Sequence, residues 1–383
     1  MERLLPIMTF LPWAASLAYG FISFYLTIKF FRERSGPAQV SSNAVLPPVT
    51  LLKPLHGADS RTRETLSSFI NQDYPEFQVI FGVTDPDDPA RKVAERLIAE
   101  HPDRDLSISV RGTDAPNGKV GNIENMARLA RYDIIAISDS DILAARDALR
   151  MVAEGFADPA VGVVTCLYRG AGARDIGSAF ESLTINTDFL PQVLTAERLE
   201  GLTFALGALM AVRKEALDKI GGFSALRDFL ADDYKLGNLA YRAGYKVKLS
   251  GVLLDSVQES GSVGGYFSHQ LRWARTYRAC RPKGYFLSVL TKTTALAIIF
   301  LLSTGFSPAG WSVFAASLAI RQAQAMYLEA RYIKAAGALR WYWLLPVKDI
   351  VSIIIWASSF TGNKVRWGNE SFLVDGEGRM AKL

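Results

Sequence analysis

The chain begins and ends in long apolar stretches, which predict membrane-associated helices at both ends. Residues 4–31 carry almost no charge and exceed the roughly 20 residues that a helix needs to cross a bilayer. Residues 285–304 form a second strong span, whereas 311–320 and 341–360 are weaker because they run into Arg321 and Lys348-Asp349. Charges at membrane depth are costly and usually face protein or water. We therefore expect one or both weaker segments to be re-entrant or interfacial.

Between these stretches, short apolar runs alternate with amphipathic segments of helical length. In the first half we predict strands at 49–55, 77–83, 106–110 and 134–138, with helices at 63–70, 89–100 and 122–131. Strands that alternate with helices in this way are typical of right-handed crossovers and a parallel sheet. The pattern predicts an α/β fold with a Rossmann-like, mostly parallel sheet.

The second half of this region is less regular. It predicts strands at 162–170, 203–212 and 246–254, and helices at 175–198, at 213–220, from Asp232 onward and at 264–278. We expect five parts in the whole chain. They are a transmembrane anchor at 1–34, a linker at 35–48, an α/β domain with an interfacial helix at 49–282, a transmembrane or re-entrant region at 283–362 and a tail at 363–383.

Composition agrees with a soluble domain joined to membrane segments. The 383 residues are 49% hydrophobic and 21% charged, and the mean hydropathy is positive. The formal net charge of +5 is small and dispersed, which argues against nucleic-acid binding and suits contact with anionic lipid heads. Cys166 and Cys280 are the only cysteines, so there is no disulfide framework and no cysteine-based metal site, and we expect the α/β domain to be cytosolic.

The residues around the first apolar stretch predict a retained anchor. The stretch lacks a positively charged start and a clear small-residue cleavage site, which a secretory signal peptide would have. Lys29, Arg32 and Arg34 stand at its C-terminal end and, by the positive-inside rule, place the next segment in the cytosol. We therefore expect an integral membrane protein of a bacterial inner membrane, with its α/β domain in the cytosol.

The strongest candidate chemistry follows the strand at 134–138. That apolar run ends in Asp139-Ser140-Asp141, which places two carboxylates at the carboxyl end of a buried strand, where α/β sheets bind ligands. Two close carboxylates repel each other unless a cation lies between them. Hard oxygen ligands suit Mg²⁺ or Mn²⁺ carrying a substrate diphosphate. The alternative interpretation is an ordinary acidic turn.

Two further groups fall at predicted strand ends or helix starts. Asp85 follows the strand at 77–83, and Asp232-Asp233 opens a helix, where a carboxylate is also a common cap. In the helix at 264–278, His269, Arg272 and Trp273 stand at i, i+3 and i+4 and therefore share one face. A guanidinium on that face could bind phosphate oxygens in two places. The alternative is an amphipathic helix with its basic residues on lipid heads.

In their order along the chain, these motifs resemble the membrane-bound family-2-type glycosyltransferases. Within these, Leu51–Gly57, Gly82–Asp85 and the short C-terminal membrane region are most similar to the ceramide glucosyltransferase family, family 21, which includes bacterial hopanoid-pathway enzymes. The resemblance spans about residue 49 to the C-terminus. The four motifs that carry it are Asp85, Asp139-Ser140-Asp141, Asp232-Asp233 and the segment from His269 to Trp273.

The resemblance implies a GT-A fold with one nucleotide-sugar site and assigns roles to these residues. Asp85 would hold the uridine, Lys119 would lie near the nucleotide or its diphosphate, and Lys53 would belong to the donor site. Asp139 would approach the ribose and help Asp141 to hold the metal. Asp233 would be the catalytic base beside Asp232, with Arg272 and Trp273 in the catalytic motif. The first position of that motif usually carries Gln or Arg, whereas this chain has His269; Gln270 comes one place later and should point elsewhere.

The resemblance also implies a reaction, with alternatives left open. The first expectation is a metal-dependent, inverting transfer of glucose from UDP-glucose to ceramide, giving a β-linked glycolipid. The alternative, with shared motifs, is transfer of N-acetylglucosamine from its UDP donor to bacteriohopanetetrol. From other classes, we consider a non-catalytic membrane scaffold that binds nucleotide sugar or lipid, and a nucleotidyltransferase. The latter normally has a Gly-rich, basic loop after its first strand, whereas Leu52–Asp59 contains one glycine.

Overall fold

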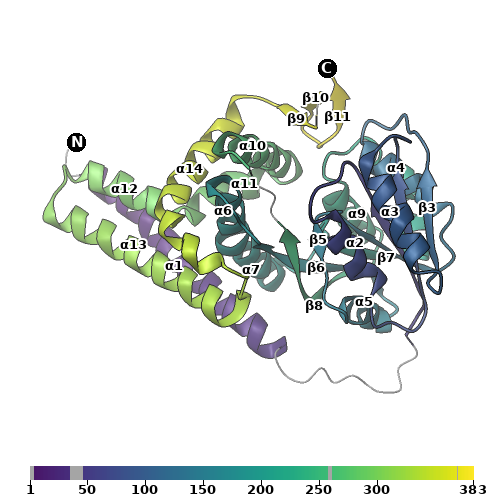
Figure 1. The fold of residues 1–383 in the computed structure, drawn as a ribbon. Helices are drawn as coiled ribbons and strands as arrows, with labels where there is room; N and C mark the ends of the chain where they lie inside the picture. Colours follow the sequence, from purple (N-terminus) through teal and green to yellow (C-terminus); the bar gives the residue numbers. More distant parts are fainter. Residues whose placement is uncertain (1–3, 35–45, 258–260, 369) are drawn as a thin grey trace.

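The computed structural model describes residues 4–34, 46–257, 261–368 and 370–383; most of the predicted linker, at 35–45, lies outside these ranges. A mixed eight-stranded sheet with helices around it stands beside a group of long helices (Figure 1). The strand order in this sheet is β3-β2-β1-β4-β7-β6-β8-β5. The strands are β1 (Val49–Pro54), β2 (Phe77–Val83), β3 (Leu106–Val110), β4 (Ile134–Ser138), β5 (Ile142–Leu143), β6 (Val161–Ala171), β7 (Leu209–Arg213) and β8 (Lys246–Val257).

The first half of the sheet is parallel, as predicted. β1 lies between β2 and β4, with Val49 opposite both Phe77 and Ile134, and β3 extends the parallel set beyond β2. Every residue of β4 is buried, which explains why its sequence is a continuous apolar run without alternation. The α/β class with a mostly parallel sheet is therefore confirmed.

The second half of the sheet differs from the prediction. β7 runs antiparallel to both β4 and β6, and it begins at Leu209 instead of 203. The residues before it leave the ladder because Leu206 bonds a side chain: its amide donates to the hydroxyl of Thr165, and this hydroxyl donates to the Leu206 carbonyl. Apolarity alone predicted a longer strand than the backbone forms.

The helices around the sheet agree with most predicted positions, and one boundary matters for function. The helix expected from 122 begins at Gly118, because the Asn117 side chain accepts from the Val120 amide and caps it. Lys119, which the predicted bounds left outside this helix, is therefore in the first turn of α4. The elements are α2 (Thr62–Ile70), α3 (Pro89–Glu100), α4 (Gly118–Ala127), α5 (Ala148–Ala153), η1 (Glu154–Ala157), α6 (Ile176–Thr184), η2 (Ile185–Phe189), α7 (Leu190–Glu200), α8 (Lys214–Lys219), η3 (Phe223–Leu226), α9 (Asp232–Arg242) and α10 (Val263–Cys280).

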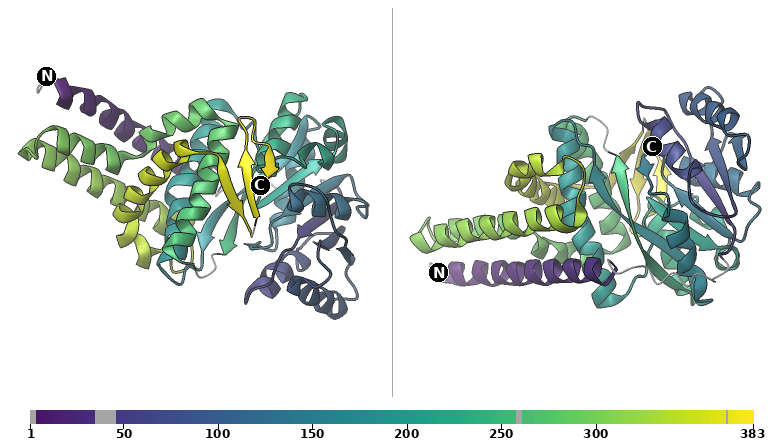
Figure 2. Two further views of the ribbon diagram at one scale, coloured as in Figure 1. Left: turned by 90° about the horizontal axis from the view of Figure 1, so that it is seen from above. Right: turned by 60° about the horizontal axis from the view of Figure 1, so that its bottom comes forward.

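The terminal apolar segments form the group of long helices. α1, α12 and α13 pack against one another and extend away from the sheet (Figure 2). In the described parts of the chain, two helical segments are long and apolar enough to cross a membrane, Leu5–Glu33 and Ala338–Thr361. The elements are α1 (Leu4–Arg34), α11 (Pro282–Leu287), η4 (Ser288–Thr291), α12 (Thr293–Ser303), α13 (Pro308–Leu328), η5 (Glu329–Ile333), η6 (Ala338–Leu344), α14 (Leu345–Ser358) and η7 (Ser359–Thr361).

The span predicted at 285–304 is not one straight helix. It bends by 65° where Lys292 separates η4 from α12, so it is either a broken span or a re-entrant turn. The Lys292 side chain at this break is directed to polar partners, Asp188 at 3.4 Å and Ser352 at 2.5 Å. A continuous apolar span would need an apolar residue at position 292. Lys292 stands there instead and bonds partners on other elements.

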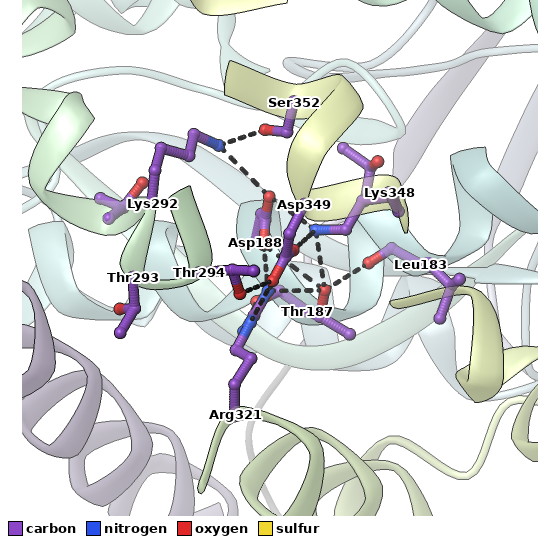
Figure 3. A network of polar contacts seen from close by, with 12 residues as sticks. Leu183, Thr187, Asp188, Lys292, Thr293, Thr294, Arg321, Lys348, Asp349 and Ser352 are labelled. Atoms are coloured by element: carbon purple, nitrogen blue, oxygen red, sulfur yellow. Dashed lines mark hydrogen bonds and ion pairs between the residues drawn. The ribbon is translucent and has the colours of Figure 1, made fainter. Parts of the chain in front are cut away.

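The charges that interrupt the C-terminal apolar segments belong to one buried network (Figure 3). Asp188 of η2 contacts Arg321 at 2.5 Å, Lys348 at 3.0 Å and Lys292 at 3.4 Å. Asp349 contacts Lys348 at 2.7 Å and Arg321 at 3.3 Å, and Lys348 has no exposed surface. These charges face protein, as expected, and they join α13 and α14 to the helix that precedes α7.

The tail predicted at 363–383 forms a second, three-stranded sheet. Its strands are β9 (Lys364–Trp367), β10 (Glu370–Val374) and β11 (Met380–Lys382). The Met380 amide donates to the Asp228 carbonyl at 2.7 Å, and the Leu230 amide donates to the Gly378 carbonyl at 3.2 Å. The C-terminus therefore braces the segment that leads directly into α9, where two of the candidate acidic residues lie.

Candidate active site

Lys53 of β1 fixes the end of β4, where the candidate acidic site begins. Its fully buried amino group donates to the Ser138 hydroxyl at 3.2 Å and to the Asp139 carbonyl, and it lies 4.1 Å from the centre of the Phe69 ring. Burial lowers the pKa of Lys53 to about 7, against the opposing effect of Asp141 and Asp139. Lys53 was expected in the donor site; the structure places it beneath the Asp139 backbone.

Lys119 joins carboxylates from two elements. From the first turn of α4, its amino group lies 2.6 Å from Asp139 Oδ1 and 3.3 Å from Asp232 Oδ2. Burial by itself would lower the pKa of Lys119, but the charges of Asp139, Asp232 and Asp233 outweigh it and raise this pKa. Lys119 therefore stays charged and holds β4 and α9 together electrostatically.

Asp232 and Asp233 occupy the first turn of α9. The residue before them is Ala231, which has no side chain that could cap the helix, and Asp233 Oδ1 accepts from the Tyr234 amide at 2.7 Å. Burial, followed by the negative charge of Asp232, raises the pKa of Asp233 to about 6, although Lys119 opposes this shift. A carboxylate with a pKa close to neutrality is suited to accept a proton.

Two residues that the sequence analysis did not single out help to build the site. A Cβ atom on Gly207 would lie 3.1 Å from Asp233 Oδ2 and 3.2 Å from Asp139 Oδ2, so these carboxylates flank its backbone. The Ser256 hydroxyl of β8 donates to Asp141 Oδ2 at 3.2 Å. Neither residue belongs to a recognisable motif. Gly207 lies in the segment before β7, which pairs with β4, and Ser256 lies opposite Ile142 where β8 pairs with β5, so only the packing of distant segments brings them here.

The predicted face of α10 is present. The rings of His269 and Trp273 are 4.9 Å apart, and Trp273 lies 6.2 Å from the ring of Phe189. The half-buried guanidinium of Arg272 makes no hydrogen bond or ion pair within the described ranges. Burial lowers the pKa of Arg272, while nearby carboxylates, including Asp139 and Asp233, oppose this shift. Arg272 is therefore a cation near the acidic cluster with its donors free.

Gln270 shares a bonding partner with His269. It was predicted to point in another direction from His269, and its buried amide donates to Glu181 Oε2 at 2.7 Å. His269 Nδ1 lies 2.7 Å from Oε1 of the same carboxylate. Consecutive helix positions diverge by about 100°, yet a two-oxygen partner on a neighbouring helix can engage both.

Asp85 belongs to a different loop from the residues of this cluster. It is exposed in the loop after β2, where its Oδ1 accepts from the Asp87 amide at 2.9 Å. Its neighbour Asp88, which the sequence analysis did not select, is buried and accepts from the amides of Gly57 at 2.9 Å and Ala90 at 2.8 Å. Asp88 thus fixes the loop after β1 onto the start of α3, and no ion pair or hydrogen bond among the described residues joins Asp85 to the other site residues.

The family model described as "Glycosyl transferase family 21" matches residues 8–380. The chain belongs to this family. Among its relatives, "Ceramide glucosyltransferase 3" of Caenorhabditis elegans is 28% identical over 246 residues, which is 64% of this chain and 53% of that protein. "Ceramide glucosyltransferase" of Komagataella phaffii is 31% identical over 156 residues, 38% of this chain and 29% of that protein. The chain thus spans about half of the first relative's length.

A solved structure also resembles this family 21 chain. Mannosyltransferase PcManGT from Pyrobaculum calidifontis, in complex with GDP-Man and Mn²⁺, aligns with a TM-score of 0.49 and 21% identity. The alignment covers 90% of this chain and 98% of that one.

The family 21 resemblance implies a divalent metal at Asp139 and Asp141, and the donor set fits one in part. Burial, and after it the charge of Asp139, raises the pKa of Asp141. A cation between the two carboxylates would offset both effects, because it stabilises their charged forms. Within the described residues, no three Asp, Glu, His or Cys side chains gather as a complete metal site. The two carboxylates therefore suit an ion that takes further oxygens from a bound diphosphate and water.

Proposed function

We propose that this protein transfers a hexose from a UDP-sugar to a hydroxyl group of a membrane lipid, with inversion at the anomeric carbon. The observation that supports this best is the convergence of Asp139, Asp232 and Asp233 around Lys119, next to the unpaired Arg272. The relatives named ceramide glucosyltransferase favour UDP-glucose and ceramide as the first pair to test. We infer Asp139 and Asp85 as contacts to the nucleoside.

In the proposed reaction, Asp233 acts as the base. Its carboxylate removes the proton from the lipid hydroxyl as that oxygen bonds to the anomeric carbon and the bond to the UDP oxygen breaks. The product is a β-glycoside, and UDP leaves with the bonding electrons. Arg272 neutralises the charge that develops on the diphosphate. Lys119 lies near this diphosphate. Mg²⁺ or Mn²⁺ held by Asp139 and Asp141 would supply Lewis-acid stabilisation of the same charge.

The membrane segments support a lipid acceptor. α1 exposes large apolar side chains along its length, such as Met8 at 68% and Leu11 at 64% exposed, which a lipid environment would cover. α10 packs against both α6 and α14, so Trp273 and Arg272 are on an element between the sheet and the C-terminal helices. We propose 1–34 as the anchor, 49–282 as the cytosolic transferase domain and 283–362 as the C-terminal membrane region.

The test of this function is UDP release by purified protein in detergent with Mg²⁺ or Mn²⁺. UDP-glucose and UDP-N-acetylglucosamine are each combined with ceramide and with bacteriohopanetetrol. Turnover with one pair, lost in Asp141→Ala, would support the transferase and identify its substrates. Binding of UDP without turnover by any pair would instead favour a non-catalytic scaffold, and lipid carried through purification would then be identified.

The charge of Asp232 should set the acidic limb of the pH profile. A base with a pKa of about 6 is protonated below that pH, so we expect kcat to fall about tenfold per pH unit below pH 6. Asp232→Asn removes the neighbouring negative charge, which should lower the pKa of Asp233 and move this limb to lower pH. The measurement is kcat between pH 4.5 and 8, with Asp218→Asn, an exposed change on α8, as the control. A limb that stays in place would exclude Asp232 as its cause.

A further inference from the structure

Glu181 of α6 holds the two residues that precede the Arg272-Trp273 pair. Its side chain is 11% exposed, and its two carboxylate oxygens accept separately from His269 Nδ1 and from Gln270 Nε2, both at 2.7 Å. Because an ionised carboxylate only accepts hydrogen bonds, the His269 ring must carry a proton on Nδ1. We propose that Glu181 is a positioning residue, which orients α10 so that Arg272 faces the acidic cluster with its guanidinium free for a diphosphate. This inference rests on the proposed transferase function.

The geometry fixes the rotation of α10 about its axis. His269 and Gln270 point from the helix in directions about 100° apart, so one carboxylate that binds both allows only one rotational setting. A second contact between the helices lies one turn earlier: the hydroxyls of Thr184 and Tyr266 are 2.9 Å apart, and the rings of Phe180 and Tyr266 are 5.3 Å apart. With α10 held at two successive turns, the direction of Arg272 is determined by α6.

Glu181 offsets the positive charge of Arg272 without binding its guanidinium. Glu181 is the strongest of the charges that oppose the effect of burial on the pKa of Arg272. Its oxygens are nevertheless engaged by His269 and Gln270, and no ion pair between Glu181 and Arg272 occurs in the described chain. Glu181 therefore stabilises the half-buried guanidinium of Arg272 without occupying its donors, which remain available to phosphate oxygens.

This pairing explains how the chain accommodates histidine at the first position of the motif. A histidine with its Nδ1 proton held by a carboxylate presents a fixed ring, and that ring packs 4.9 Å from Trp273. The helix that carries Glu181, α6, continues directly into η2. Phe189 of η2 lies 6.2 Å from the ring of Trp273. α6 and η2 together hold the imidazole and the indole of the motif.

The test is UDP binding by the full-length protein in detergent, measured by calorimetry for Glu181→Ala and Glu181→Gln, alone and combined with Arg272→Met. We expect Glu181→Ala to raise the Kd for UDP about tenfold in the wild-type background and to have little further effect when Arg272 is absent. Glu181→Gln keeps only one acceptor oxygen and therefore one of the two contacts, so its loss should be smaller. Glu329→Gln is the matched control, because Glu329 is also buried and bonds Tyr342 and Asn186 away from the motif.

The outcomes separate this inference from the proposed function. An equal loss of UDP affinity with and without Arg272, or an equal loss in Glu329→Gln, would mean that Glu181 acts only on general stability and would overturn the inference. If Glu181→Ala does not fold, the comparison rests on Glu181→Gln, for which unchanged UDP affinity is the contrary result. A wild-type protein that binds no UDP would overturn the proposed function itself.

Discussion

Asp233→Asn should lower kcat by roughly 10²- to 10⁴-fold, the usual contribution of a general base, while leaving the Kd for UDP nearly unchanged. Asparagine has the same shape, and its side-chain oxygen can still accept from the Tyr234 amide, as Asp233 Oδ1 does at 2.7 Å. What is lost is the group whose pKa is raised to about 6 and which takes the proton of the acceptor hydroxyl. Single-turnover measurement at saturating donor and acceptor isolates this chemical step.

The matched control for Asp233 is the exposed carboxylate of Asp218, for which Asp→Asn should leave kcat unchanged. UDP binding by calorimetry shows whether the Asp233 variant still folds around the nucleotide. A variant with full turnover would remove Asp233 as the base. Loss of UDP affinity together with turnover would instead assign Asp233 to donor binding or to the fold of the site.

Asp188→Ala should destabilise the folded protein by about 3–5 kcal/mol, as expected when one partner of a buried ion pair is removed. Asp188 lies 2.5 Å from Arg321, 3.0 Å from Lys348 and 3.4 Å from Lys292, so its loss leaves three cations with the single carboxylate of Asp349. Because the network joins α13 and α14 to η2, unfolding should begin with these helices. Denaturant unfolding in detergent measures the loss, and limited proteolysis locates it.

A double variant tests whether Asp188→Ala is unstable because it leaves buried cations unpaired or because it leaves a packing defect. Asp188→Ala combined with Lys348→Met removes one charge of each sign, so the double variant should be more stable than Asp188→Ala alone. Asp158→Asn, which breaks the exposed pair with Lys246 at 3.0 Å, is the control and should change stability little. A double variant less stable than Asp188→Ala would show that Lys348 contributes through contacts other than its pairing with Asp188.

The sequence was sufficient for features that depend on local backbone geometry. Continuous apolar runs identified β1, β2 and β4, and the helix at Pro89–Glu100 was predicted to the residue, because side-chain periodicity follows directly from helix or strand geometry. The same reasoning placed Asp139 and Asp141 immediately after β4. It also put His269, Arg272 and Trp273 on one helical face, since their spacing alone fixes their relative direction.

Only the tertiary structure decided which partners these residues meet. Glu181 is 88 residues from His269, and Ser256 is 115 residues from Asp141, so nothing local to either motif indicates these contacts. Lys53, which the family resemblance assigned to the donor site, supports the Asp139 backbone because strand pairing buries it between β2 and β4. Partnership depends on how distant elements pack, and hydrophobic periodicity specifies only which face is buried, not what covers it.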